Sequence, residues 1–382
     1  MAFPETNFPF HLDNPRAWRT YLGGSQLDLL HGDAAGTDGH FPEEWIMSVV
    51  SARNAGREQF QDEGMNHLRG TEIPLKTVLE KDPAGYLGEG QTDASLGVLT
   101  KLIDSAERLT LQVHPDRPTA MRLFHSPYGK TECWHILSSR SIDGEAPCIY
   151  YGFKENVTRE MWKELFQKQD IPGMLDAMQK YPVKPGDTIL IEGGMPHAIG
   201  AGCFLVEIQE PTDYTIRVER TTPSGFPVAD SMCHQGLGFE KMFECFNYEP
   251  HTRQQIHERG FIRPETVLET PAGKIMTLVG YANTPLFRLD EVTVSGQLTV
   301  PAQGDSFSGL YVLEGSGVLS AHGRSLNITK TDQIFVPAGT GDFTLTADAP
   351  LRVLHFFGPA KSAVLTRSPS CGSVPSRRRK QP

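Results

Sequence analysis

The sequence predicts a mainly β protein with two jelly-roll barrels and a helical insertion in the first barrel. Three observations favour this fold class. From about residue 280 onward, short apolar runs alternate with glycine and proline turns, which is typical of a closed antiparallel barrel or jelly roll. A similar series of strand patterns lies between residues 109 and 209, interrupted by one helical stretch. A turn–strand–turn unit occurs once in each half, which indicates an internal repeat.

The strand patterns are short apolar runs, several with a period of two, that end at turn residues. In the first half we expect strands at 109–114, 132–137, 146–153, 188–192 and 204–209. In the second half we expect them at 310–313, 317–321, 333–336, 342–345 and 351–357. Two stretches near the N-terminus, 16–22 and 98–103, are expected to be short helices.

The helical insertion is expected at residues 158–181, where apolar side chains recur on one helical face. Pro172 interrupts this stretch, so two successive helices are expected. The apolar residues are Met161, Trp162, Leu165 and Phe166 in the first helix, and Met174, Leu175 and Met178 in the second.

The internal repeat relates residues 185–197 to residues 330–342. With Asp187 aligned on Asp332, His197 falls on Asp342. The second copy therefore has an aspartate where the first has a histidine. If the first copy holds a metal ion, we expect that the second does not.

Composition and charge exclude several classes of function. The chain has 382 residues and a formal net charge of −10, which argues against general nucleic-acid binding, because phosphates attract Lys and Arg. Six basic residues and no acidic residue lie in 358–382, a composition typical of a solvated, disordered end. No secretory signal or membrane-spanning stretch is recognisable, and the six cysteines form no CxxC pair. These features predict a cytoplasmic protein with free thiols.

Four polar residues could form a metal site in the first barrel. Gln112 and His114 are two residues apart on an expected strand, so their side chains share one face, while Leu111 and Val113 share the other. Inward-facing polar groups are costly unless they bind something. The partners expected on later strands are Glu132 and His197. One amide oxygen, two imidazoles and one carboxylate suit a divalent ion such as zinc. The alternative is that each histidine is a hydrogen-bonded core residue.

Three further residues could carry chemistry. Lys130 precedes Glu132 by two positions, so in an extended segment both face the same side, and the lysine could bind an anion or relay a proton. Glu207 and Arg217 follow His197. Arginine suits the clamping of phosphate or the stabilisation of an oxyanion. A solvated lysine and a structural Arg–Glu pair are the alternatives.

These segments resemble the type I mannose-6-phosphate isomerases, metal-dependent enzymes of the cupin superfamily, and in particular their short bacterial branch. The likeness extends over roughly residues 15–358. It is carried by Leu109–Asp116, Gly129–Leu137, Gly194–Ala198, and Glu207–Gln209 followed by Asp213–Arg217. Gly129 stands where the longer, eukaryote-like branch has a histidine, so a role of that histidine is not transferred.

The resemblance implies two cupin-like barrels and one zinc ion, or another divalent ion, bound by Gln112, His114, Glu132 and His197. It implies that Arg217 is catalytic and that Lys130 and Glu207 lie in the active site. The implied reaction interconverts mannose 6-phosphate and fructose 6-phosphate through an enediolate. The alternatives are an isomerase of another phosphosugar and a non-enzymatic sugar-binding cupin.

The organisation that follows has three parts. Residues 1–265 are expected to form the metal-binding catalytic domain, 266–358 a second cupin-like barrel without metal, and 359–382 the basic tail. The expected partner is a small phosphosugar, with neither nucleic acid nor membrane, and the oligomeric state stays open.

Overall fold

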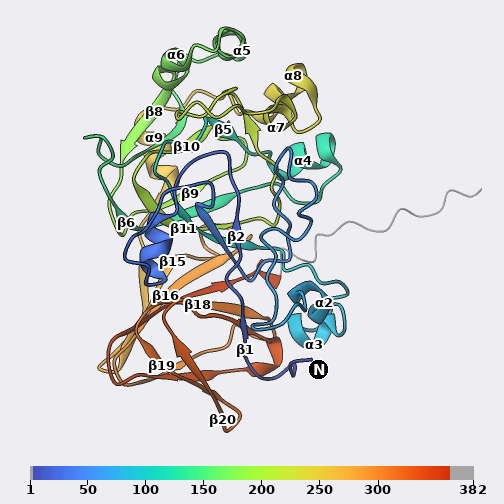
Figure 1. The fold of residues 1–382 in the computed structure, drawn as a ribbon, viewed down its shortest axis with the longest axis vertical. Helices are drawn as coiled ribbons and strands as arrows, with labels where there is room; N and C mark the ends of the chain where they lie inside the picture. Colours follow the sequence, from blue (N-terminus) through green and yellow to red (C-terminus); the bar gives the residue numbers. More distant parts are fainter. Residues whose placement is uncertain (1–2, 362–382) are drawn as a thin grey trace, which may run out of the picture.

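A computed structural model describes residues 3–361 of the chain, and β-strands arranged in four sheets dominate it (Figure 1). The predicted basic tail lies almost entirely outside the described residues. The strand order of every sheet is open, so closed barrels are not confirmed. None of the helices within 3–361 is both long and apolar enough to cross a membrane.

The first half of the chain forms two sheets. A seven-stranded sheet has the order β13 (Phe261–Ile262), β9 (Thr188–Ile191), β6 (Glu132–Ser139), β11 (Cys203–Gln209), β4 (Leu99–Asp104), β3 (Glu43–Ile46) and β2 (Arg16–Ala17). A five-stranded sheet has the order β12 (Ile216–Arg217), β5 (Gln112–Val113), β10 (His197–Ile199), β7 (Cys148–Phe153) and β8 (Met178–Pro182). One apolar core contains side chains of β6 and β9 together with those of β7 and β10, so the two sheets pack face to face.

The second half forms the other two sheets. A seven-stranded sheet has the order β1 (Phe10–Leu12), β21 (Gln333–Val336), β18 (Ser308–Glu314), β23 (Leu351–Phe357), β16 (Arg288–Val294), β15 (Gly273–Val279) and β14 (Glu265–Thr270). A four-stranded sheet contains β17 (Gln297–Val300), β22 (Phe343–Thr346), β19 (Ser316–Ala321) and β20 (Arg324–Thr329). Aliphatic side chains of both sheets share one core.

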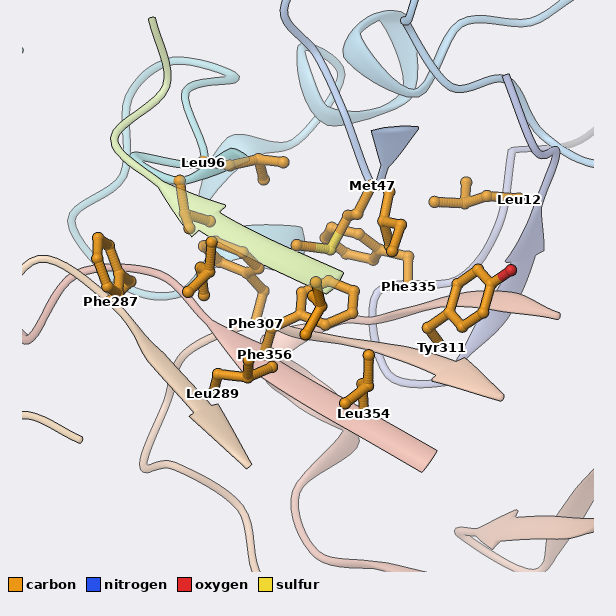
Figure 2. Close-up of a cluster of buried hydrophobic side chains, with 14 of the residues drawn as sticks. Leu12, Met47, Leu96, Phe287, Leu289, Phe307, Tyr311, Phe335, Leu354 and Phe356 are labelled. Atoms are coloured by element: carbon orange, nitrogen blue, oxygen red, sulfur yellow. The ribbon is translucent and has the colours of Figure 1, made fainter. Parts of the chain in front are cut away.

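The two halves are joined by the N-terminal segment and by a shared core. β1 pairs antiparallel with β21, so residues near the N-terminus complete a sheet built from the C-terminal half (Figure 1). Figure 2 shows the core at this junction, where Leu12 and Met47 pack with Phe335 and Phe356. The boundary predicted at residue 265 stays a prediction.

The helices lie at the periphery. They are α1 (Ser25–Leu30), α2 (Leu75–Leu79), α3 (Pro83–Leu87), α4 (Arg117–Phe124), α5 (Arg159–Lys168), α6 (Ile171–Asp176), α7 (Asp230–His234), α8 (Gly238–Lys241) and α9 (Arg253–Gly260), with 3-10 turns at Met242–Cys245 and Ala338–Thr340. The predicted insertion corresponds to α5 and α6. Their apolar residues pack in one core with Leu111, Val113 and Ile216, on the apolar face of β5 and β12.

Four secondary-structure predictions are wrong, wholly or in part. Residues 98–103 form strand β4 rather than a helix, because all six residues of β4 are buried and a fully buried strand loses the period-two signal. Residues 16–22 begin with the two-residue strand β2 and contain no helix. Met178 belongs to strand β8, which pairs with β7, so helix α6 ends earlier than expected. The strand expected at 109–114 is limited to Gln112–Val113.

The internal repeat has a structural counterpart. In the first copy the Asp187 carboxylate accepts a hydrogen bond from the backbone N–H of Lys184 at 2.9 Å. In the second copy Asp332 accepts one from the backbone N–H of Thr329, also at 2.9 Å. Each aspartate closes the turn before a buried four-residue strand, β9 or β21. An equivalent aspartate hydrogen bond therefore stabilises the turn in both copies.

Candidate functional site

The predicted metal ligands come together between the two sheets of the first half. His114, Glu132 and His197 have ligand atoms within 4.8 Å of one another, and all three residues are buried. Gln112 and His197 are directly opposite each other on β5 and β10, and Gln112 Nε2 lies 3.3 Å from His197 Nε2. Rotation of the Gln112 amide by half a turn would present its oxygen to the same point, because that rotation exchanges the positions of the amide oxygen and nitrogen.

Backbone contacts orient both imidazoles toward this point. His114 Nδ1 lies 2.7 Å from the carbonyl oxygen of Tyr214, and His197 Nδ1 lies 2.8 Å from that of Met195. A carbonyl can only accept, so each Nδ1 carries the proton and donates it. Each Nε2 therefore keeps a lone pair that faces Glu132, which is the arrangement of metal-bound histidines.

The charge states of the three residues are those of metal ligands. Burial and the nearby Lys130 ammonium lower the pKa of His114 to about 3, and burial lowers the pKa of His197. Burial alone would raise the pKa of Glu132, but the Lys130 ammonium opposes this effect and holds it well below its usual range. Two neutral imidazoles and one carboxylate are thus available.

A cation already lies at the point where these groups converge. Lys130 Nζ is 2.9 Å from His114 Nε2 and forms an ion pair with Glu132. The other carboxylate oxygen of Glu132, Oε1, accepts no hydrogen bond from any described residue. The predicted proximity of Lys130 and Glu132 is confirmed. An ammonium held by ligand atoms and a buried unsatisfied oxygen both indicate that the site suits a positive ion.

Glu207 lies beside this cluster on β11. Its Oε2 accepts a hydrogen bond from Trp134 Nε1 at 3.0 Å, and its Oε1 lies 3.3 Å from Lys101 Nζ and 3.9 Å from Lys130 Nζ. Burial raises the pKa of Glu207, as does the Glu132 charge, while the two lysines act in the opposite direction. The net shift is upward, which suits a group that gives and takes a proton.

Arg217 lies on β12, opposite Gln112 of β5. Its Nη1 donates to the backbone carbonyls of Thr215 at 3.2 Å and Met232 at 3.0 Å. No carboxylate oxygen of a described residue lies within 4.0 Å of its guanidinium nitrogens. A structural Arg–Glu pair with Glu207 is therefore not formed, and the positive charge of Arg217 is uncompensated at short range.

Sequence reasoning missed a buried ionic network, which lines one cavity together with Lys130, Glu207 and Arg217. Arg19 Nε lies 2.9 Å from Glu43 Oε1, and Arg19 Nη2 lies 3.4 Å from Asp213 Oδ1. Lys101 lies between Glu43 and Glu207, 3.7 Å from the first. One signal could have revealed it. Lys101 interrupts the apolar run of β4, and a charged residue inside a buried strand requires a charged partner.

Comparison with known proteins shows which proteins this chain is similar to. The sequence model described as "Mannose-6-phosphate isomerase, cupin domain" matches residues 279–356. The mannose-6-phosphate isomerase ManA of Bacillus subtilis is 28% identical over 261 residues, covering 68% of this chain and 74% of the relative. The mannose-6-phosphate isomerase of Streptococcus mutans is 36% identical over 121 residues, 32% of this chain and 35% of the relative. The chain is thus similar to mannose-6-phosphate isomerases over about two thirds of its length, and residues 279–356 match the cupin domain of that family.

Solved structures of the family show the same fold. The mannose 6-phosphate isomerase of Bacillus subtilis superposes with a TM-score of 0.70 at 24% identity, covering 91% of this chain and 99% of that one. A zinc-bound mannose 6-phosphate isomerase superposes with a TM-score of 0.65 at 14% identity, covering 92% and 99%. The family's cupin model matches the C-terminal half, whereas the candidate site lies in the first half.

Proposed function

We propose that this chain is a metal-dependent aldose–ketose isomerase that interconverts mannose 6-phosphate and fructose 6-phosphate. One observation carries the proposal: two buried imidazoles and one carboxylate direct their free atoms to a single point beside Glu207. The relatives and structural neighbours described above also support the proposal, because they are named as mannose-6-phosphate isomerases.

The residues fit a zinc ion. His114, Glu132 and His197 would hold it, with Gln112 as a fourth ligand through its amide oxygen, and this set leaves room for a substrate oxygen. A zinc-bound protein is among the structural neighbours. When bound, a divalent ion supplies Lewis acidity that lowers the cost of negative charge on a carbonyl oxygen.

Proton transfer is assigned to Glu207 and Lys130. Glu207 Oε1 would take the proton from C2 of the aldose and return it to C1 of the enediolate. Lys130 is paired with Glu132 and so is an ammonium, which donates rather than accepts. It would supply a proton to the oxygen on C1 and recover one from the oxygen on C2. Arg217 would stabilise the enediolate oxygen, because its charge is not compensated by a carboxylate.

The remaining predictions form part of the proposal. Each face-to-face sheet pair would be one cupin-like jelly roll, and only the first would hold metal. Within the described residues the second contains no metal-ligand cluster, which fits this assignment. Five described cysteines are free thiols, which is consistent with a cytoplasmic location. The sixth, Cys371, lies outside the described residues.

The test is a coupled isomerase assay with mannose 6-phosphate, with metal content measured on the same sample. We expect turnover that chelation abolishes and zinc restores. Bound metal without turnover would indicate a different phosphosugar or a sugar-binding protein. The variant Arg217→Ala should lose turnover and keep its metal, because Arg217 is not a ligand. Full activity of this variant would refute its role.

A further inference from the structure

Two neighbouring cavities meet at the candidate site. The inner cavity is lined by Lys101, Lys130, Glu207 and Arg217, and its free volume of about 40 Å³ would admit only about three water molecules. The outer cavity, of about 540 Å³, lies at the surface. Asn54 lines both cavities, so the two cavities are adjacent. A hexose phosphate is too large for the inner cavity alone.

All but one of the described cationic side chains that line the inner cavity form ion pairs with carboxylates. Arg19 pairs with Glu43 and Asp213, Lys101 pairs with Glu207, and Lys130 pairs with Glu132. Among the described basic residues that line this cavity, only Arg217 forms no ion pair with a carboxylate. A phosphate that displaced a committed cation would leave a buried carboxylate unpaired, which is strongly unfavourable.

The outer cavity offers two arginines. The Arg57 guanidinium donates to Glu63 through Nε at 3.3 Å and through Nη2 at 2.8 Å, so its charge is compensated. Arg53 is exposed, and no carboxylate of a described residue lies within 4.0 Å of its guanidinium. The one carboxylate among the described residues lining this cavity, Glu58, accepts from the backbone N–H of Gly56 at 2.9 Å.

Arg53 is also held close to the reacting centre. Its backbone N–H donates to Asp213 Oδ2 at 3.0 Å, which fixes the segment to the ionic network. Its guanidinium lies over the Tyr214 ring, 5.4 Å from the centroid. The carbonyl of Tyr214 is the group that accepts from His114 Nδ1. A single residue therefore links the exposed guanidinium to a proposed zinc ligand.

From these contacts we infer that Arg53 binds the phosphate group of the substrate at the mouth of the site. The inference rests on the proposed function. It assigns one of the two arginines without a carboxylate partner to each end of the substrate. Arg217 faces the carbons that exchange the proton, in the inner cavity. Arg53 binds the dianionic phosphate, in the outer one, and its planar guanidinium can donate two parallel hydrogen bonds.

The test compares Arg53→Gln with the wild-type enzyme and with a matched control, Arg253→Gln. Arg253 is also exposed and stacked on a tyrosine, with its guanidinium 4.1 Å from the Tyr181 centroid, and no described carboxylate lies within 4.0 Å of it. Loss of a charge-assisted contact should raise the KM of Arg53→Gln for mannose 6-phosphate roughly tenfold or more, with kcat little changed. Inhibition by inorganic phosphate should weaken by a similar factor, and Arg53→Lys should recover part of both.

Three outcomes are decisive. An unchanged KM and an unchanged inhibition constant for phosphate in Arg53→Gln would overturn the inference, as would an equal effect in Arg253→Gln. A fall in kcat with unchanged KM would also overturn it, because it would place Arg53 in the chemistry. If the wild-type enzyme does not turn over mannose 6-phosphate, the proposed function fails. Titration of wild type and Arg53→Gln with inorganic phosphate, followed by ³¹P NMR, then still decides whether Arg53 binds phosphate.

Discussion

Replacement of Tyr311 by phenylalanine should destabilise the protein through a buried carboxylate in the other half of the chain. The Tyr311 hydroxyl donates to Glu44 Oε1 at 2.8 Å, and both residues are fully buried. A hydrogen bond to a charged group contributes about 1.5–3 kcal/mol. Asn14 Nδ2 also donates to Glu44 Oε1, at 3.1 Å, and His31 Nε2 lies 2.6 Å from Glu44 Oε2. The carboxylate keeps these partners, so we expect a loss near the lower limit, about 1.5–2 kcal/mol.

The assay is urea unfolding followed by tryptophan fluorescence, with a thermal melt in parallel. At about 1.2 °C per kcal/mol for a chain of 382 residues, the melting temperature should fall by about 2 °C. Tyr151→Phe is the matched control. The Tyr151 side chain is buried as well, but its hydroxyl has no hydrogen-bond partner among the described residues. Removal of that hydroxyl should cost nothing or stabilise the fold. Equal stability of Tyr311→Phe and Tyr151→Phe would refute the reasoning.

Two further predictions concern a proton-transfer group and acid stability. Glu207→Gln should lower kcat by about 10²–10⁴ with metal content unchanged, and turnover within threefold of wild type would exclude Glu207 as the base. Burial, aided by Arg288, lowers the pKa of His355 to about 3, so this histidine stays neutral in the folded chain. Below about pH 6.5 the unfolded chain binds a proton there that the folded chain does not, so stability falls as the pH is lowered. Between pH 6 and 4, His355→Gln should reduce the slope of the free energy of unfolding against pH by about 1.4 kcal/mol per pH unit. The measurement is urea unfolding at each pH. An unchanged slope would contradict the prediction.

The residues of the candidate metal site could be identified because several of them carry a local signal. Gln112 and His114 alternate with apolar residues, and the structure places Gln112 toward His197 while Leu111 and Val113 join the core under α5. The turn that Asp187 closes before β9, the strand that leads to His197, repeats the turn that Asp332 closes before β21. Such patterns depend on neighbours in sequence, which is why sequence alone reveals them.

Lys101 signals a buried charge within β4, but its partners in the ionic network could not be predicted, because sheet pairing between distant segments brings them together. Glu43 and Lys101 become neighbours when β3 pairs with β4, and Glu207 joins them when β11 pairs with the other edge of β4. The same pairing buries β4 on both faces, which conceals its strand character and made it resemble a helix. Register across a sheet is a tertiary property, so the sequence around Lys101 does not show which carboxylates pair with it.

Strand β3 connects the reacting centre to the C-terminal sheets. Glu43 and Glu44 are consecutive, so their side chains lie on opposite faces of the strand. Glu43 contacts Arg19 and Lys101 in the inner cavity, whereas Glu44 accepts from Tyr311 of β18. The sheet pair of the second half is thereby attached to the strand that carries Glu43, a carboxylate that lines the inner cavity. The Tyr311–Glu44 hydrogen bond therefore anchors β3 to β18, next to the residue that pairs with Lys101.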